Sequence, residues 1–220
     1  MTLVAHNAVP SSLPPFPNCV AMLDGPAAFE AVHKPGCAAS IWRRELLPDF
    51  QAWLDSLAPK HLPEGRLIIQ PEAVKDAVKQ LCEIAATPDC AEREMLCNDI
   101  VALSELLCVT FKCAYLRLRL EKVTDNACCK FHRDAITARL VCTYRGRGTE
   151  YGLPDQAQGG DIDHNKIFAV PMGSPFLIRG SLWPETPFSN LQHRSPPIEG
   201  TGETRLLLVL DPISDPNDCV

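Results

Sequence analysis

The 220-residue sequence predicts an α+β fold in which a helical N-terminal part packs on a β-rich C-terminal barrel or jelly roll. Apolar residues recur at helical spacing over residues 45–57, 71–86 and 91–107. From residue 111 the pattern changes to alternation with period two, and Gly- and Pro-rich turns separate short apolar segments. Several short strands with no helical pattern between them are typical of an antiparallel barrel or jelly roll.

The N-terminal elements follow from this reading. Residues 1–38 are rich in Pro, Ala and Gly, which predicts an irregular arm. Pro59 and Pro63 end the first helix, residues 66–70 form a short strand, and Pro71 opens the second helix. The helix over residues 91–107 has a broad apolar stripe, which indicates burial between two layers. We expect an arm (1–38), a helical part (39–108) and a barrel part (109–220), the last two forming one compact unit.

In the C-terminal part, residues 111–121 alternate, with Leu116, Leu118 and Leu120 on one parity and Tyr115 on the other. Further strands are predicted at residues 130–134, 139–144, 166–171, 175–179 and 204–211. The turns between them fall at residues 145–148, 152–160, 171–173 and 196–202.

Composition narrows the classes of function. Apolar residues make up 46% and charged residues 22%, as in an ordinary globular protein. The net charge is −6 and basic residues form no long run, so binding to nucleic acid is not expected. No segment approaches the roughly 18 apolar residues of a membrane span, and residues 1–18 lack the pattern of a signal peptide. We expect a cytoplasmic protein with no membrane contact.

The 11 cysteines are odd in number and show neither a regular framework nor a C-x-x-C pair. Without an export signal, most of them are expected to be reduced and buried as small hydrophobic residues.

A candidate metal site begins with His132 and Asp134. Residues two apart in a strand point to the same face, so this imidazole and this carboxylate would project together. A third ligand would complete a two-His-one-carboxylate set, which leaves coordination positions open as non-haem Fe(II) oxygenases require. His193 is the best third ligand, because a rigid Ser-Pro-Pro turn and then a strand follow it. His164 lies in a polar loop and is expected to face water.

Arg205 opens the last predicted strand. If its parity faces the barrel interior, it puts a guanidinium inside near the mouth, where a carboxylate can accept its bidentate fork. A pair with Glu203 or Asp211 is the alternative, and both readings stay open.

The ordered set of H-x-D, Gly159-Gly160, Pro171-x-Gly173, a distal His and a downstream Arg resembles the double-stranded β-helix of Fe(II)/2-oxoglutarate dioxygenases over residues 128–211. The resemblance implies that His132, Asp134 and His193 bind iron. It also implies that Arg205 holds the distal carboxylate of 2-oxoglutarate, with assistance from Tyr144 or Thr143.

The amino-acid sequences of several segments resemble those of a bacterial family called domain of unknown function 1826. The segments are WRR at residues 42–44, CKFHRD at 129–134, RLVCTYRGRGTEY at 139–151, GSLWP at 180–184, HRSPP at 193–197 and RLLLVLD at 205–211. This resemblance covers most of the chain, and it implies a link to metal homeostasis, especially of zinc.

These observations lead to two hypotheses about function, which differ in whether Cys128 or Cys129 binds the metal. The first is a mononuclear Fe(II)/2-oxoglutarate-type oxygenase that acts on an unknown small molecule or protein. The second is a non-catalytic zinc-binding module, since a thiolate added to the three ligands would suit tetrahedral zinc. The spacing of twelve residues between His193 and Arg205, long for such oxygenases, also leaves the second open. Strand parity favours Cys128 as the fourth ligand, unless a turn precedes Phe131 or both thiols lie in a loop.

Overall fold

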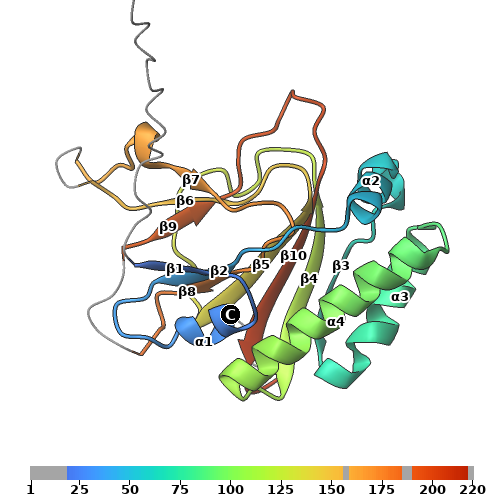
Figure 1. Ribbon diagram of the computed structural model, residues 1–220, viewed down its shortest axis with the longest axis horizontal. Coiled ribbons are helices and arrows are strands. Elements are labelled where there is room, and N and C mark those ends of the chain that lie inside the picture. The colour runs from blue at the N-terminus through green and yellow to red at the C-terminus, as the bar shows by residue number, and fades with distance from the viewer. Residues whose placement is uncertain (1–18, 156–158, 185–189, 218–220) are drawn as a thin grey trace, which may run out of the picture.

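The computed structural model describes residues 19–155, 159–184 and 190–217, and it contains two β-sheets (Figure 1). The large sheet has seven strands in the order β1-β2-β8-β5-β10-β4-β3, and the small sheet has three in the order β7-β6-β9. Every pairing is antiparallel except that of β1 with β2, which is parallel. The strands are β1 (Val20–Leu23), β2 (Ala39–Trp42), β3 (Gly65–Ile69), β4 (Tyr115–Val123), β5 (Ala138–Arg145), β6 (Glu150–Gly152), β7 (Phe168–Ala169), β8 (Phe176–Arg179), β9 (Gln192–Arg194) and β10 (Arg205–Ile213).

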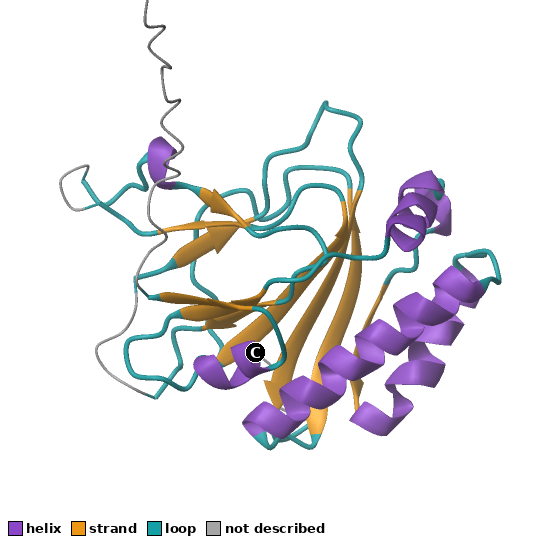
Figure 2. Ribbon diagram, in the orientation of Figure 1, coloured by secondary structure: helices purple, strands orange, loops and turns teal. Residues whose placement is uncertain are grey.

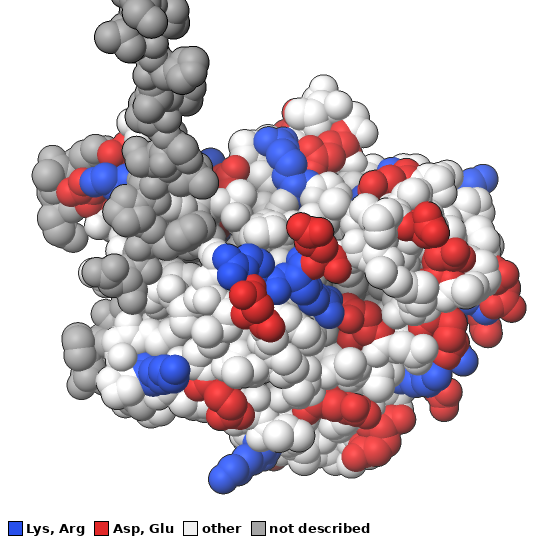
Figure 3. Space-filling view, viewed as in Figure 1, with Lys and Arg blue, Asp and Glu red and all other residues white. Residues whose placement is uncertain are grey.

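Helices cover one face of the large sheet, on the side of β10, β4 and β3 (Figure 2). They are α1 (Ala27–Ala31), α2 (Pro48–Ser56), α3 (Val74–Ile84) and α4 (Ala91–Phe111), with short 3-10 turns at Pro59–His61, Pro71–Ala73 and His164–Lys166. Among the described residues, no helix is both long enough and apolar enough to cross a membrane. Acidic and basic side chains are interspersed over the face shown in Figure 3.

Alternation along the central strands creates two cores. Leu206, Leu208 and Leu210 on β10 pack with α3 and α4 in one buried cluster. Leu207 and Val209 point to the other face and pack in a second cluster between the two sheets. The inter-sheet face also carries the polar side chains of the candidate site, so burial on the helix side leaves this face available for chemistry.

The three helices and the strand at residues 66–70 form where periodicity predicts them, as α2, α3, α4 and β3. The N-terminal part, however, is not only helical. It contributes β1, β2 and β3 to the large sheet, so the picture of a purely helical part lying on a separate barrel is too simple. Residues 20–23 and 27–31 form β1 and α1 within the segment expected to be irregular, and its residues 1–18 lie outside the described residues. The domain boundaries stay a prediction.

The predicted strand over residues 130–134 is wrong. This segment is a loop whose one ladder contact is an isolated bridge between His132 and His193. A turn precedes it, because Cys128 has a φ of 55° and the amide of Cys129 donates to the carbonyl of Asn126. A residue in the left-handed region interrupts an extended chain, so the strand cannot continue back through Cys128.

Ten of the cysteines lie in the described residues, and all of these are free thiols. Cys37, Cys82, Cys97, Cys108 and Cys142 are buried, whereas Cys128 is exposed. Burial as small hydrophobic residues therefore holds for half of the described thiols, and Cys128 is the clear exception.

Candidate metal centre

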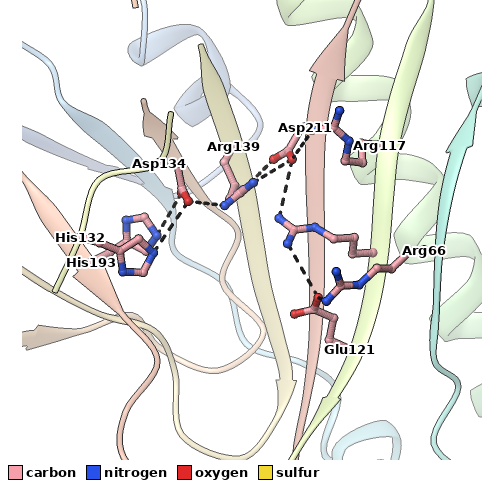
Figure 4. Close-up of polar contacts among 9 residues, drawn as sticks. Arg66, Arg117, Glu121, His132, Asp134, Arg139, His193 and Asp211 are labelled. Carbon is pink, nitrogen blue, oxygen red and sulfur yellow. Dashed lines mark hydrogen bonds and ion pairs between the residues drawn. The ribbon is translucent and has the colours of Figure 1, made fainter. Parts of the chain in front are cut away.

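His132 and His193 lie side by side because their backbones form a bridge. The amide of each donates to the carbonyl of the other, at 3.0 and 3.1 Å. Directly opposed residues of an antiparallel pair project to the same side, and the two ring centroids are 4.6 Å apart (Figure 4). The small sheet fixes His193 from the other side, since β9 pairs with β6 through Tyr151.

Asp134 completes the group from the loop that follows His132. Its Oδ1 lies 3.8 Å from Nε2 of His132, and its Oδ2 lies 3.2 Å from Nε2 of His193. One ligand atom from each of the three residues falls within 4.8 Å of the others. The loop is held in place because the amide and hydroxyl of Ser181 donate to the Asp134 carbonyl, at 2.8 and 3.1 Å.

The donor atoms of this group are oriented toward one another. Nδ1 of His132 is 2.8 Å from the Lys130 carbonyl, a contact that places the ring proton on Nδ1 and leaves the Nε2 lone pair facing Asp134. Oδ2 of Asp134 is buried and accepts no hydrogen bond from the described residues. Two imidazole nitrogens and an unsatisfied carboxylate oxygen fit a divalent transition metal, and three protein ligands leave coordination positions open.

Arg139 connects this carboxylate to the large sheet (Figure 4). Its Nη1 donates to Oδ1 of Asp134, while Nε and Nη2 donate to Asp211 at 2.7 and 2.8 Å. Burial opposes ionisation of Asp134, but the close contact with His193 and the charges of His193, Arg139 and His132 outweigh it and lower the Asp134 pKa to about 2. The carboxylate is therefore ionised and ready to bind a cation at neutral pH.

The two thiols are not members of this group. Among the described residues, the cluster able to hold a metal comprises His132, Asp134 and His193 alone. The parity argument for Cys128 fails, because the turn before Phe131 interrupts the predicted strand. Cys128 nevertheless lines the same cleft as the two histidines. Cys129 is half-buried in the preceding turn.

Arg205 lies fully buried at the start of β10, and within the described part of the chain its guanidinium donates only to neutral acceptors. Nε donates to the Arg147 carbonyl at 2.7 Å, Nη1 to Oγ of Ser195 at 2.9 Å and Nη2 to Oγ1 of Thr143 at 3.4 Å. Burial lowers the pKa of Arg205 to about 10. A buried guanidinium with neutral partners is a site where an anion would be stabilised.

The alternative partners of Arg205 are taken by other residues. Glu203 accepts from Nε of Arg147 at 2.9 Å, and Asp211 is held by Arg139. Neither carboxylate forms an ion pair or hydrogen bond with Arg205 in the described part of the chain. A direct pairing of Arg205 with Glu203 or Asp211, left open by the sequence, is therefore not formed.

Of the other residues considered from the sequence, one lies beside Arg205 and two lie away from the site. Thr143 meets Arg205, but Tyr144 lies on the opposite face of β5, where its hydroxyl donates to Asp99 at 2.6 Å. The structure does not bring Tyr144 to the cleft, because successive residues of a strand face opposite sides. His164 is exposed in a 3-10 turn, as expected.

The candidate metal group, formed by His132, Asp134 and His193, lies at a cleft whose space, open mouth included, is about 430 Å³. Its lining includes Arg119, Arg139 and Arg194 beside the two histidines. These three arginines were not predicted as site residues from the sequence. The signal was present for Arg119, since it alternates with the buried leucines of β4 and must therefore face away from the helices.

Comparison with known proteins gives a family and a fold. A family model described as protein of unknown function (DUF1826) matches residues 23–211. A search of curated proteins gives no match. Among solved structures, the chain is similar to the dioxygenase for auxin oxidation 1 from Arabidopsis thaliana in its binary complex with 2-oxoglutarate. The TM-score is 0.50 and the identity 12%, over 89% of this chain and 92% of that chain.

Two further structures lie at lower similarity. The rice dioxygenase for auxin oxidation has a TM-score of 0.47 at 12% identity, over 88% of this chain and 82% of that one. A Pseudomonas putida prolyl-4-hydroxylase has a TM-score of 0.44 at 12% identity, over 86% of this chain and 98% of that one. At this level of identity, the likeness to the Arabidopsis dioxygenase shows the fold alone: a mixed α/β fold with a large, mostly antiparallel sheet.

Proposed function

The chain belongs to the DUF1826 family, and from its own site we propose that it is a mononuclear non-haem metal enzyme of the Fe(II)/2-oxoglutarate-dependent oxygenase type. The observation that carries this proposal is the convergence of His132, Asp134 and His193 within 4.8 Å at the wall of a cleft. Such a three-ligand set leaves positions for a co-substrate and oxygen, which a closed structural site does not offer.

The fold supports the same proposal. We assign the two sheets to a double-stranded β-helix, with β4, β5, β8 and β10 in the large sheet facing β6, β7 and β9. The likeness to a dioxygenase that was solved with 2-oxoglutarate supports this assignment. In this arrangement the ligands lie between the sheets, where the inter-sheet core excludes water from one side of the site.

Each residue then has a role. His132, Asp134 and His193 would hold Fe(II), which supplies oxygen activation when it is bound. Arg139 positions Asp134 by donating to Oδ1, so that Oδ2 remains directed at the imidazoles. Arg205 would receive the distal carboxylate of 2-oxoglutarate, with Thr143 beside it. Ser195 both contacts Arg205 and lines the cleft, so the guanidinium lies directly behind the cleft wall.

The test is spectroscopic. Anaerobically purified protein with Fe(II) is expected to develop a metal-to-ligand charge-transfer band when 2-oxoglutarate is added, and to release succinate under oxygen. His132→Ala and His193→Ala should remove both signals, because each takes away one of three ligands. His164→Ala is the matched control, since His164 is exposed and outside the group. Absence of the band in the unsubstituted protein contradicts the proposal.

Metal analysis of freshly purified protein separates the zinc alternative, which the position of Cys128 on the cleft keeps open. If the protein is an oxygenase, it should bind iron, and the iron content should be unchanged in Cys128→Ala and Cys129→Ala. Stoichiometric zinc released by either thiol substitution would instead favour a closed zinc-binding module.

A further inference from the structure

The cleft beside the metal group is lined by three arginines and one carboxylate, Glu121, and two of the arginines already have a close carboxylate partner. Arg139 is held by Asp134 and Asp211. Arg194 donates to Glu150 at 2.7 Å and lies 4.4 Å from the centre of the Phe131 ring. These two guanidinium groups have their anions and are therefore parts of the wall.

Arg119 on β4 is different. Its Nε and Nη2 atoms are buried and have no hydrogen-bond partner among the described residues. The nearest carboxylates are Asp211, 3.7 Å from Nη2, and Glu121, 3.8 Å from Nη1. These distances allow long ion pairs but exceed those of a hydrogen bond, so Nε and Nη2 of Arg119 are donors that the described residues leave unsatisfied.

Both neighbouring carboxylates are committed to other arginines. Asp211 is bound through both oxygens by Arg139, at 2.7 and 2.8 Å, and Glu121 is bound by Arg66 at 2.8 Å (Figure 4). Neither can turn to Arg119 without leaving a closer partner. The acceptor for Arg119 must therefore come from outside this set.

The neighbouring positive charges act in the same direction. A metal cation bound by Asp134 would add positive charge beside Arg139, which contacts that carboxylate. Burial, and then repulsion from Arg139, lower the pKa of Arg119. A small anion in the cleft would relieve both effects.

We propose that Arg119 is the anchor for a carboxylate on the primary substrate, so that the proposed oxygenase acts on a small organic acid or an acidic side chain. This inference rests on the proposed function. A guanidinium can bind a carboxylate through two parallel hydrogen bonds, which fixes the orientation of the substrate as well as its position. Arg119 shares the cleft with His132 and His193, so an acid held there lies beside the metal group.

The co-substrate and the substrate would use different arginines. Arg119 pairs with Val209 on β10, four residues beyond Arg205 on that strand. At about 3.4 Å per residue, the two positions are roughly 14 Å apart along the strand direction. One guanidinium lies behind the wall at Ser195 and the other faces the cleft, so two carboxylates can be held at once.

The first experiment needs no metal. Metal-free ¹⁵N-labelled protein is titrated with benzoate while the arginine Nε–Hε resonances are followed, with benzamide as the neutral probe. Benzoate should bind and benzamide should not, and Arg119→Gln should weaken benzoate binding by at least about tenfold. Arg119→Lys keeps the positive charge but loses the two-pronged hydrogen-bond donor. Its affinity for benzoate should therefore lie between those of the unsubstituted protein and Arg119→Gln.

Arg117→Gln is the matched control. Arg117 lies on the same strand and parity, with the same 19% side-chain exposure, but it does not line the cleft. It should bind benzoate like the unsubstituted protein. Failure of the unsubstituted protein to bind benzoate, or equal binding by Arg119→Gln at unchanged thermal stability, overturns the inference.

The second experiment separates this inference from the proposed function. Arg119→Gln should keep the Fe(II)–2-oxoglutarate absorption band and its affinity for 2-oxoglutarate. A loss of about tenfold in that affinity would make Arg119 the co-substrate anchor and overturn the assignment to the substrate. Absence of the band in the unsubstituted protein would contradict the oxygenase alone, because benzoate binding is measured without metal.

Discussion

Asp134 is the residue at which the metal group and the large sheet meet. One carboxylate oxygen faces the two imidazoles, and the other accepts from Arg139, which also holds Asp211 on β10. Outer contacts of this kind orient a metal ligand and commonly change metal affinity by about 10–100-fold when removed. The geometry of the site is therefore fixed from the sheet as well as from its own loop.

The lowered pKa of Asp134 makes a prediction for the metal-free protein. A carboxyl whose folded pKa, about 2, lies below its ordinary value of 3.8 adds stability that is present above the unfolded pKa and is lost as pH falls through the folded pKa. This difference corresponds to about 2 kcal/mol. Urea unfolding of Asp134→Asn should thus show a deficit of about 2 kcal/mol near pH 6 that shrinks below about pH 4.

Asp161→Asn provides the control for this measurement, because Asp161 is exposed. It should change the free energy of unfolding by no more than about 0.5 kcal/mol at each pH. A deficit of Asp134→Asn that is the same at every pH would show that the carboxylate gains nothing from its neighbours.

At the residue scale, the sequence predicted that His132, Asp134 and His193 come together, but it did so through partly wrong geometry. His132 and Asp134 were paired on the assumption of a strand, yet they meet in a loop. The same assumption placed Cys128 on the same face as His132 and Asp134, and there it failed. Cys128 has a positive φ, and a cysteine in the sequence gives no sign of that backbone conformation. Arg119 was overlooked because one arginine in an alternating strand has no motif of its own.

At the scale of elements, the loop that carries Asp134 depends on a glycine beyond β8. The amide of Gly180 donates to the Thr137 carbonyl at 2.9 Å, next to the contacts between Ser181 and Asp134. A Cβ added at Gly180 would lie 1.9 Å from the carbonyl oxygen of Ile136. This contact is with backbone, so the two segments could accommodate a side chain only by moving apart.

Gly180→Ala should therefore lower both stability and metal affinity. Overpacking of this kind costs about 1–3 kcal/mol, and displacement of Asp134 should weaken metal binding by at least about tenfold. Gly25→Ala is the matched control, because a Cβ there meets nothing within 4 Å. Chemical denaturation and metal titration give the two readouts. Gly180→Ala protein with normal metal affinity would show that the loop is positioned independently of this contact.

Elements were predictable in proportion to their length and periodicity. The amphipathic patterns of α3 and α4 extend over 11 and 21 residues, enough to establish a helical period. The strands β1 and β2 have four residues each, and β2 is almost wholly buried. A short strand that is covered on both faces has no polar alternation, so the sequence offered no way to distinguish it from an irregular segment.

At the scale of the whole molecule, the large sheet separates a structural face from a chemical one. Helices α3 and α4 pack on one side, and the metal group, the cleft and the small sheet lie on the other. The mixed fold with its mostly antiparallel sheet followed from the change of period near residue 111. The joining of N-terminal strands to that sheet did not, because pairing between distant segments leaves no local pattern.

A buried polar network joins the layers. Arg44, just after β2, donates through both Nη atoms to Asp99 on α4 at 2.6 Å, and through Nε to the Gly173 carbonyl at 2.6 Å. Tyr144 on β5 donates its hydroxyl to the same Asp99 at 2.6 Å. One carboxylate therefore connects the N-terminal segment, the long helix and the centre of the sheet.

Removing that carboxylate should destabilise the whole fold and leave the site chemistry intact. Asp99→Ala leaves the Arg44 charge and the Tyr144 hydroxyl without their acceptor, which should cost about 3 kcal/mol in urea unfolding. Because Arg44 and Asp99 act together, the double variant with Arg44→Ala should lose less stability than the two single variants combined. Metal binding per folded molecule should not change, since the network lies on the helix face of the sheet. Strictly additive losses of stability would show that Arg44 and Asp99 are not coupled. Loss of metal binding in fully folded Asp99→Ala protein would show that the two faces of the sheet are not independent.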